Sequence, residues 1–160
     1  MRILILTVFT TSMSKKHKWN RTLYPRLLRR PKMNKEEKDK KKEKDIEALR
    51  ERIYQFVIRV VNLVKELPNT LLGNRIGGQL LDAATSVGAN FEEACAAFSK
   101  ADFTYKISIS RKEAFETNYW LRVVRDSKLL PQKRMGAIIQ ESEEIKKILS
   151  SSVKTARENP

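Results

Sequence analysis

The chain has 160 residues, a length that fits one domain, and 41% of them are apolar, which is enough for a buried core. Its single cysteine, Cys95, excludes an internal disulfide and a zinc site built from cysteines, and favours a reducing, cytoplasmic location. Of the net charge of +14, most lies in residues 1–45, with 15 Lys and Arg against 5 Asp and Glu, whereas residues 46–160 hold 18 against 14. Such charge attracts nucleic acids, although a lysine-rich tail can also serve only for solubility.

Residues 1–45 predict a basic, poorly ordered tail that ends in a charged helical extension. The apolar run at residues 3–9 is much shorter than the roughly 20 residues that span a bilayer, so we expect no membrane contact. Met33 opens a second, more ordinary start, and residues 1–32 are interpreted as a tail or a start-site artefact. Residues 34–45 are almost all charged, so a helix there would be a solvated extension.

From residue 46 the sequence predicts four amphipathic helices. In the first, apolar residues recur at alternating steps of three and four, as expected for a helix that packs in a bundle. They are Ile46, Leu49, Ile53, Phe56, Val60, Leu63 and Leu67. The four helices are expected at about residues 35–67, 70–98, from the cap at 99–102 to 128, and 132–152, with a frayed end at 153–160. Short connections between one-faced helices predict an all-α, antiparallel up-down four-helix bundle over residues 46–152.

The second predicted helix is rich in glycine and alanine, and Phe98 is the last residue of its apolar seam. A glycine inside a helix costs about 1 kcal/mol relative to alanine, which close approach of a neighbouring helix can offset. Close packing is the favoured interpretation for Gly88. For Gly73 to Gly78, close packing and a looped start of the helix remain equally open.

The residues for metal or nucleophilic chemistry are missing from the predicted bundle. A di-metal bundle site needs Glu-x-x-His pairs, but the only histidine, His17, lies in the tail. Cys95 has no histidine in the bundle to activate it and is interpreted as a packing residue. We therefore predict a protein that is not an enzyme and that uses no metal or other cofactor.

A polar stripe accompanies the apolar seam of the second helix at helical spacing. It consists of Arg75, Gln79, Asp82, Ser86, Asn90 and Glu93. Such a stripe is either a solvated face or a polar network between helices or subunits, which must be fully hydrogen-bonded if it is buried. In the second case Ser86, Asn90 and Glu93 would share a network with Arg111 or Glu116 of the third helix.

The segment Ser86-Val-Gly-Ala-Asn-Phe-Glu-Glu-Ala resembles the Ser-Ile-x-Ala-Asn-Ile-x-Glu-Gly/Ala signature of a known family. This is the four-helix-bundle family linked to intervening sequences in bacterial 23S ribosomal RNA genes. The segments Ser99–Phe103 and Ile109–Arg111, with Glu116, resemble the start and the motif of its third helix. The resemblance covers about residues 46–150, and Ala94 stands where many members have glycine.

The resemblance implies a homo-oligomeric ring, commonly a pentamer, of such bundles. It is also similar to the accessory variability determinant proteins of diversity-generating retroelements, which are basic rings that work with a reverse transcriptase and RNA. The motif residues Ser86, Asn90, Glu93, Arg111 and Glu116 are then expected to be structural or interface residues, and a reverse transcriptase becomes a possible partner.

The favoured function is nucleic-acid binding, to RNA more than to DNA, through the phosphate backbone. The candidate contacts are Lys35, Lys38, Lys40, Lys41, Lys42, Lys44, Arg50, Arg52 and Arg59. Aromatic residues are scarce on these segments, so base-specific recognition is not expected. The alternative is a scaffold or accessory subunit that binds proteins and does not touch nucleic acid.

Overall fold

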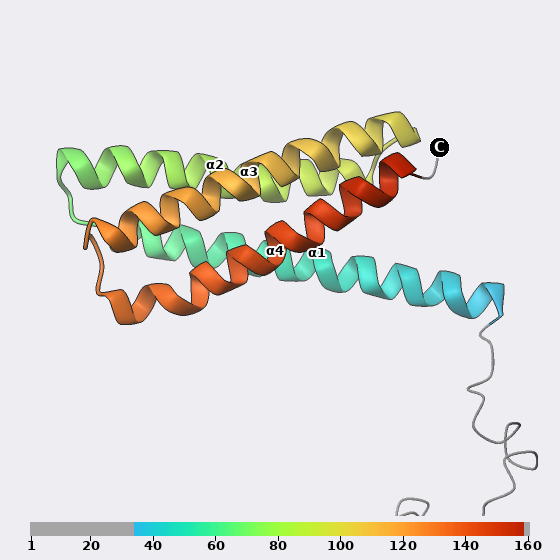
Figure 1. The fold of residues 1–160 in the computed structure, drawn as a ribbon, viewed down its shortest axis with the longest axis horizontal. Helices are drawn as coiled ribbons and strands as arrows, with labels where there is room; N and C mark the ends of the chain where they lie inside the picture. Colours follow the sequence, from blue (N-terminus) through green and yellow to red (C-terminus); the bar gives the residue numbers. More distant parts are fainter. Residues whose placement is uncertain (1–33, 159–160) are drawn as a thin grey trace, which may run out of the picture. The chain divides into compact units, whose positions relative to one another are not determined.

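The computed structural model describes residues 34–158 and divides the chain into two units, Met1–Lys38 and Asp39–Pro160. Its helices are α1 (Lys35–Lys65), α2 (Leu71–Cys95), α3 (Lys100–Asp126) and α4 (Gln132–Glu158), and the described residues contain no strand. In the second unit, successive helices run in opposite directions (Figure 1). The predicted all-α, antiparallel four-helix bundle is thus confirmed, while the predictions for residues 1–32 lie outside the described residues.

Side-chain caps define where the helices begin. At α1, Asn34 Oδ1 accepts from the Glu37 amide at 2.8 Å. The Asn34 amide in turn donates to Glu37 Oε2 at 2.9 Å. This reciprocal pair is a capping box. Thr70 and Ser99 cap α2 and α3 by accepting from backbone amides one turn further along, each at 3.1 Å. The predicted cap at Ser99 is therefore confirmed.

The buried core draws residues from all four helices. Its largest fully buried side chains include Phe56 of α1, Leu80 of α2, Leu121 of α3 and Leu149 of α4. Cα atoms of α3 come within 8 Å of both α2 and α4, so α3 packs closely against two neighbours. Among the described helices, none has the length and apolar character needed to cross a membrane.

Three predictions at the ends of the helices were wrong. Ile46 is 51% exposed and Phe98 is fully exposed, although both were assigned to apolar seams. Phe98 lies outside α2, which ends at Cys95 because Ser99 must leave the helix to cap α3. Conversely, α4 continues to Glu158 beyond the expected end near residue 152, because Val153 is buried in the core and extends the packed face.

The glycines of α2 fall into two groups. A Cβ on Gly73 would lie 2.1 Å from the Pro68 carbonyl oxygen, and one on Gly77 would lie 3.0 Å from Leu67 Cδ1. The same Cβ on Gly78 would meet nothing within 4 Å. All three lie inside α2, so the looped start is excluded, and close approach explains Gly73 and Gly77 but not Gly78. A Cβ on Gly88 would make an ordinary contact of 3.4 Å with Val57 of α1.

Candidate nucleic-acid interface

The six candidate lysines lie on the charged first part of α1. Every residue from 34 to 48 is exposed, since this part of the sequence offers no apolar side chain to bury before Ile46. The exposed lysines are Lys35, Lys38, Lys40, Lys41, Lys42 and Lys44. Five acidic residues are interspersed among them in residues 34–45, so this surface carries mixed charge rather than a strongly positive field.

The first candidate arginine of α1, Arg50, is held by carboxylates. Its guanidinium contacts Glu47 at 3.0 Å and Glu92 of α2 at 2.5 Å. The hydrogen bond that Arg50 donates to Glu92 is the main reason why the pKa of Arg50 is raised. This side chain therefore links α1 to α2.

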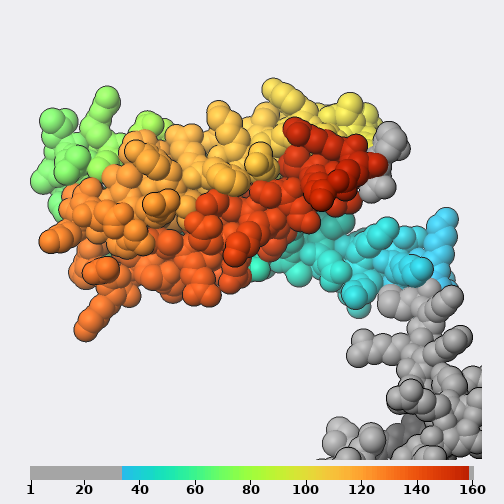
Figure 2. Space-filling model, in the orientation of Figure 1, coloured from blue at the N-terminus to red at the C-terminus, as the bar shows by residue number. Residues whose placement is uncertain are grey.

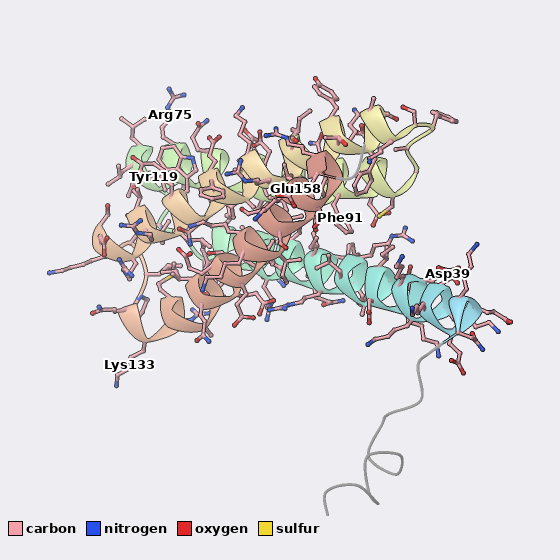
Figure 3. The ribbon with its side chains drawn as sticks, turned by 45° about the vertical axis from the view of Figure 1, so that its right-hand side comes forward. Asp39, Arg75, Phe91, Tyr119, Lys133 and Glu158 are labelled. Atoms are coloured by element: carbon pink, nitrogen blue, oxygen red, sulfur yellow. The ribbon has the colours of Figure 1, made fainter. Side chains whose placement is uncertain are left out.

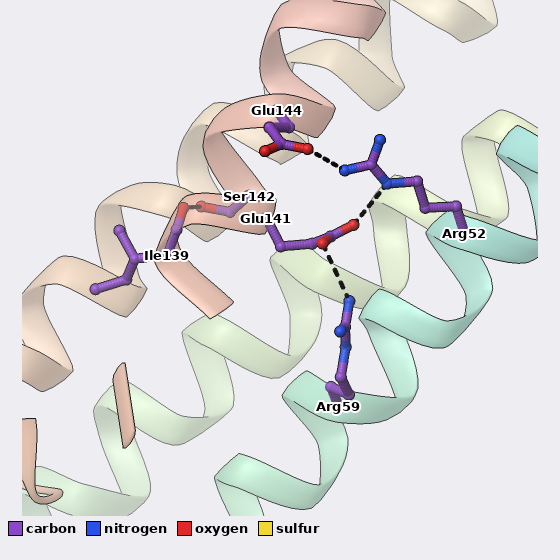
Figure 4. A network of polar contacts seen from close by, with 6 residues as sticks. All are labelled: Arg52, Arg59, Ile139, Glu141, Ser142 and Glu144. Carbon is purple, nitrogen blue, oxygen red and sulfur yellow. Dashed lines mark hydrogen bonds and ion pairs between the residues drawn. The ribbon is translucent and has the colours of Figure 1, made fainter. Parts of the chain in front are cut away.

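Arg52 and Arg59 converge with two carboxylates of α4 (Figure 4). Arg52 Nε donates to Glu141 at 2.7 Å, and the same guanidinium also hydrogen-bonds Glu144. Arg59 lies 3.6 Å from the second oxygen of Glu141. The hydrogen bond from Arg52 lowers the pKa of Glu144, which keeps that carboxylate charged at neutral pH.

The arginines of α1 were predicted from sequence as phosphate contacts, but the structure gives each of them carboxylate partners. Their charge is locally balanced, and a phosphate would have to compete with carboxylates already in place. Their direct role in the bundle is to connect helices. The sequence could not reveal this, because the partners of Arg50 and Arg52 on α2 and α4 are 42 to 92 residues away.

The family-motif residues of α2 lie at its border with α3. Asn90 Nδ2 donates to the Ser86 carbonyl oxygen one turn earlier, at 2.9 Å, and both residues are half-buried. Glu93 forms an ion pair with Lys106 of α3. Among the described residues, the polar stripe thus makes one polar contact with another helix, the Glu93–Lys106 ion pair, and its other hydrogen bonds are local.

Arg111 and Glu116, the predicted α3 partners of the stripe, do not contact it within residues 34–158. Arg111 lies on the other edge of α3, where its Nε donates to Ser150 Oγ of α4 at 3.1 Å. Glu116 accepts from Trp120 Nε1 of its own helix at 3.3 Å. The prediction of such a network inside one chain was wrong because Arg111 reaches α4 and the hydrogen bond of Glu116 stays within its own helix.

A buried polar cluster between α3 and α4 was missed. Asn118 is 2% exposed, and its amide donates to Ser142 Oγ at 2.6 Å while Lys146 Nζ donates to its carbonyl oxygen at 3.2 Å. Ser142 in turn donates to the Ile139 carbonyl at 2.8 Å. The available sequence signal was the position of Asn118, four residues after the apolar Ala114 and three before the apolar Leu121, which places it on the same side of the helix as both.

Replacing Asn118 by Ala should lower the free energy of unfolding by about 1–3 kcal/mol, because it removes the hydrogen bonds that cross the buried helix contact. Asn90→Ala should lower the free energy of unfolding by less than about 0.5 kcal/mol, since the half-buried Asn90 side chain donates only to the Ser86 carbonyl of its own helix. Urea unfolding of both variants at one subunit concentration measures the difference. Equal losses would contradict the assignment and would show that Asn90 has a buried partner outside its own subunit.

The described residues include possible metal ligands and one thiol, that of Cys95. No group of His, Cys, Asp and Glu side chains among residues 34–158 has a geometry that could hold a metal ion. Cys95 is exposed, so its predicted role as a packing residue was wrong. It lies at the rim of an apolar hollow with Phe91 and Phe103, and this partial desolvation raises the pKa of its thiol, which disfavours the reactive thiolate.

The fold and the motif residues together define a four-helix-bundle protein with a polar stripe on its second helix. The family model described as 23S rRNA-intervening sequence protein matches residues 44–151. The chain belongs to this family. A crystal structure of a protein of unknown function from the S23 ribosomal protein family of Bacteroides thetaiotaomicron is similar, with 35% identity and a TM-score of 0.62. The match covers 68% of this chain and 97% of that one. No curated protein matches the chain.

Proposed function

We propose that this protein is a cytoplasmic, non-enzymatic nucleic-acid-binding protein that acts on RNA rather than DNA. The observation that carries the proposal is the positive charge that is left after the ion pairs are made. Residues 46–160 hold 18 basic against 14 acidic residues, and several exposed cations, such as Lys100, Arg122 and Lys147, have no carboxylate within 4.0 Å among the described residues. Such cations are available to neutralise phosphates.

The preference for RNA is supported by the family, whose description names an intervening sequence of ribosomal RNA. Binding through phosphates would position the protein without reading a sequence, since base edges carry the sequence information. A reverse transcriptase as a further partner remains a prediction from the resemblance to retroelement proteins.

The test is binding of the full chain to a labelled RNA at rising salt. The proposal predicts that the logarithm of the affinity falls linearly with the logarithm of the salt concentration, because counterions are released from the phosphates. If the full chain binds no nucleic acid even at low ionic strength, the alternative of a protein-interaction scaffold is the better one.

We also propose that the protein forms a homo-oligomeric ring, as the family resemblance implies, with five subunits as the expected number. Large apolar side chains on the outer faces of α2 and α3 support self-association: Leu71 is 83% exposed, Tyr105 63% and Tyr119 56%. Light scattering at about 10 micromolar should give a mass well above that of one 18.6 kDa chain. A mass of one chain at that concentration would contradict the proposal.

A further inference from the structure

Positive charge is concentrated along the outer edge where α3 and α4 meet. We define this basic edge by Lys100, Arg111, Arg122, Lys146, Lys147 and Arg157. The two helices lie side by side on the face that Figure 2 shows, α3 in yellow to orange and α4 in orange to red. The bond from Arg111 to Ser150 Oγ, at 3.1 Å, and that from Lys146 to Asn118, at 3.2 Å, hold the helices in this register.

The remaining members of the basic edge follow from the same register. Lys147 lies one helical turn before Ser150, the partner of Arg111, so it lies on the side of α4 that borders α3. Arg122 is one helical turn beyond Asn118, so it lies on the side of α3 that borders α4. At the opposite end, Arg157 of α4 and Lys100 of α3 line one shallow depression together with Thr104. The edge thus runs along α3 from Lys100 to Arg122, which is about 33 Å at a rise of about 1.5 Å per residue.

Most cations of the basic edge lack a close ion pair, although Lys147 acts electrostatically on Glu143 and Glu144, and Arg122 on Asp126, from beyond 4.0 Å. Lys146 pairs with Glu143 at 3.0 Å, but the other five cations have no carboxylate within 4.0 Å in the part of the chain that the structure describes. The situation on the α1 side is the reverse, since its arginines are neutralised by Glu92, Glu141 and Glu144. The basic edge is therefore the better site for a polyanion.

An exposed aromatic ring lies in the middle of this edge. Phe115 is 44% exposed, and the Arg111 guanidinium carbon and Lys146 Nζ lie 5.0 and 4.7 Å from its ring centroid. An aromatic ring among cations is the combination that binds single-stranded nucleic acids, since a base stacks on the ring while the cations contact the flanking phosphates. In a duplex the bases stay stacked on one another, so they are not free to stack on such a ring.

We propose that the basic edge binds a single strand of nucleic acid, with a base stacked on Phe115 and phosphates contacted by Arg111, Arg122 and Lys147. This inference rests on the proposed function and assigns its site, which differs from the α1 residues predicted from sequence. The length of the edge suits a site within the range of about 4–16 nucleotides known for single-strand binders.

The experiment measures binding of the full chain to a labelled oligouridine of about 16 nucleotides by fluorescence anisotropy across a salt series. The edge variant combines Arg111→Gln, Arg122→Gln and Lys147→Gln. The matched control combines Lys65→Gln, Arg75→Gln and Lys133→Gln, which remove the same charge away from the edge. Arg75 and Lys133 project outward from the bundle (Figure 3), and none of the three control residues has a carboxylate within 4.0 Å among residues 34–158.

The edge variant should bind at least about ten-fold more weakly at low salt, and its salt slope should fall by about two, at about 0.7 per lost phosphate contact on a single strand. The control should change much less. Phe115→Leu, which keeps an apolar side chain at this half-exposed position, should weaken oligouridine binding about ten-fold and leave binding to duplex RNA unchanged. Oligothymidine bound equally well would support the single-strand site but would contradict the proposed preference for RNA over DNA.

Two results would overturn the inference while the proposed function stands: equal losses in the edge and control variants, or a loss of duplex binding in Phe115→Leu as large as that for the single strand. If the unaltered chain binds neither oligouridine nor duplex RNA at low salt, the proposed function fails, and this inference fails with it. Circular dichroism confirms that each variant keeps its helices before binding is compared.

Discussion

Gly73→Ala should lower the free energy of unfolding by about 1–3 kcal/mol, whereas Gly78→Ala, five residues further along the same helix, should raise it by about 1 kcal/mol. The opposite signs follow from the surroundings. A Cβ on Gly73 would overlap the Pro68 carbonyl oxygen at 2.1 Å, which is backbone and cannot rotate away. A Cβ on Gly78 would meet nothing within 4 Å, so only the helix propensity of alanine counts there.

Urea unfolding of the two variants and the unaltered chain, at one subunit concentration, measures both effects. The comparison is controlled internally, because the same substitution is made in one helix. If Gly73→Ala were as stable as the unaltered chain, the tight turn from Pro68 into α2 would not be a constraint on the fold. A loss of stability in Gly78→Ala would show that another molecule packs against that position.

The helices of this protein could be predicted because their information is local. The spacing of apolar residues in residues 46–67 and the capping sequence at Ser99 act within a few turns of the chain. The end of α4 was missed for the same reason. Whether Val153 is buried depends on residues of other helices, which the local pattern does not show. The exposure of Ile46 also depends on how far the neighbouring helices reach along α1.

The candidate site was harder to predict, because the role of a charged side chain depends on which residue it pairs with. In the sequence, Arg52 and Lys147 look alike, since each is a cation on an amphipathic helix. In the structure, Arg52 pairs with two carboxylates of α4, whereas Lys147 has none within 4.0 Å in the described chain. Partner choice depends on which edges of two helices meet, and a one-residue rotation of a helix moves a side chain by about 100°. For this reason the interface that we propose lies on the α3–α4 edge and not on α1, where the sequence predicted it.

We propose that the bundle's own charges bind nucleic acid, independently of the basic residues that precede it. Residues 1–32 contain nine Lys and Arg and no acid, so a variant that begins at Met33 loses much of the net charge of +14. It keeps α1 to α4 and the basic edge. In an oligomer the remaining charge is repeated in each subunit and can concentrate on one face.

The most direct measurement is therefore the affinity of this Met33 variant for labelled RNA over a range of about 50 to 200 mM salt. We predict binding at the low end and a steep, linear fall of its logarithm with the logarithm of salt, with a slope set by the phosphate contacts that the bundle retains. Absence of salt-sensitive binding at low ionic strength, while the full chain still binds, would assign the affinity to residues 1–32 and contradict this account.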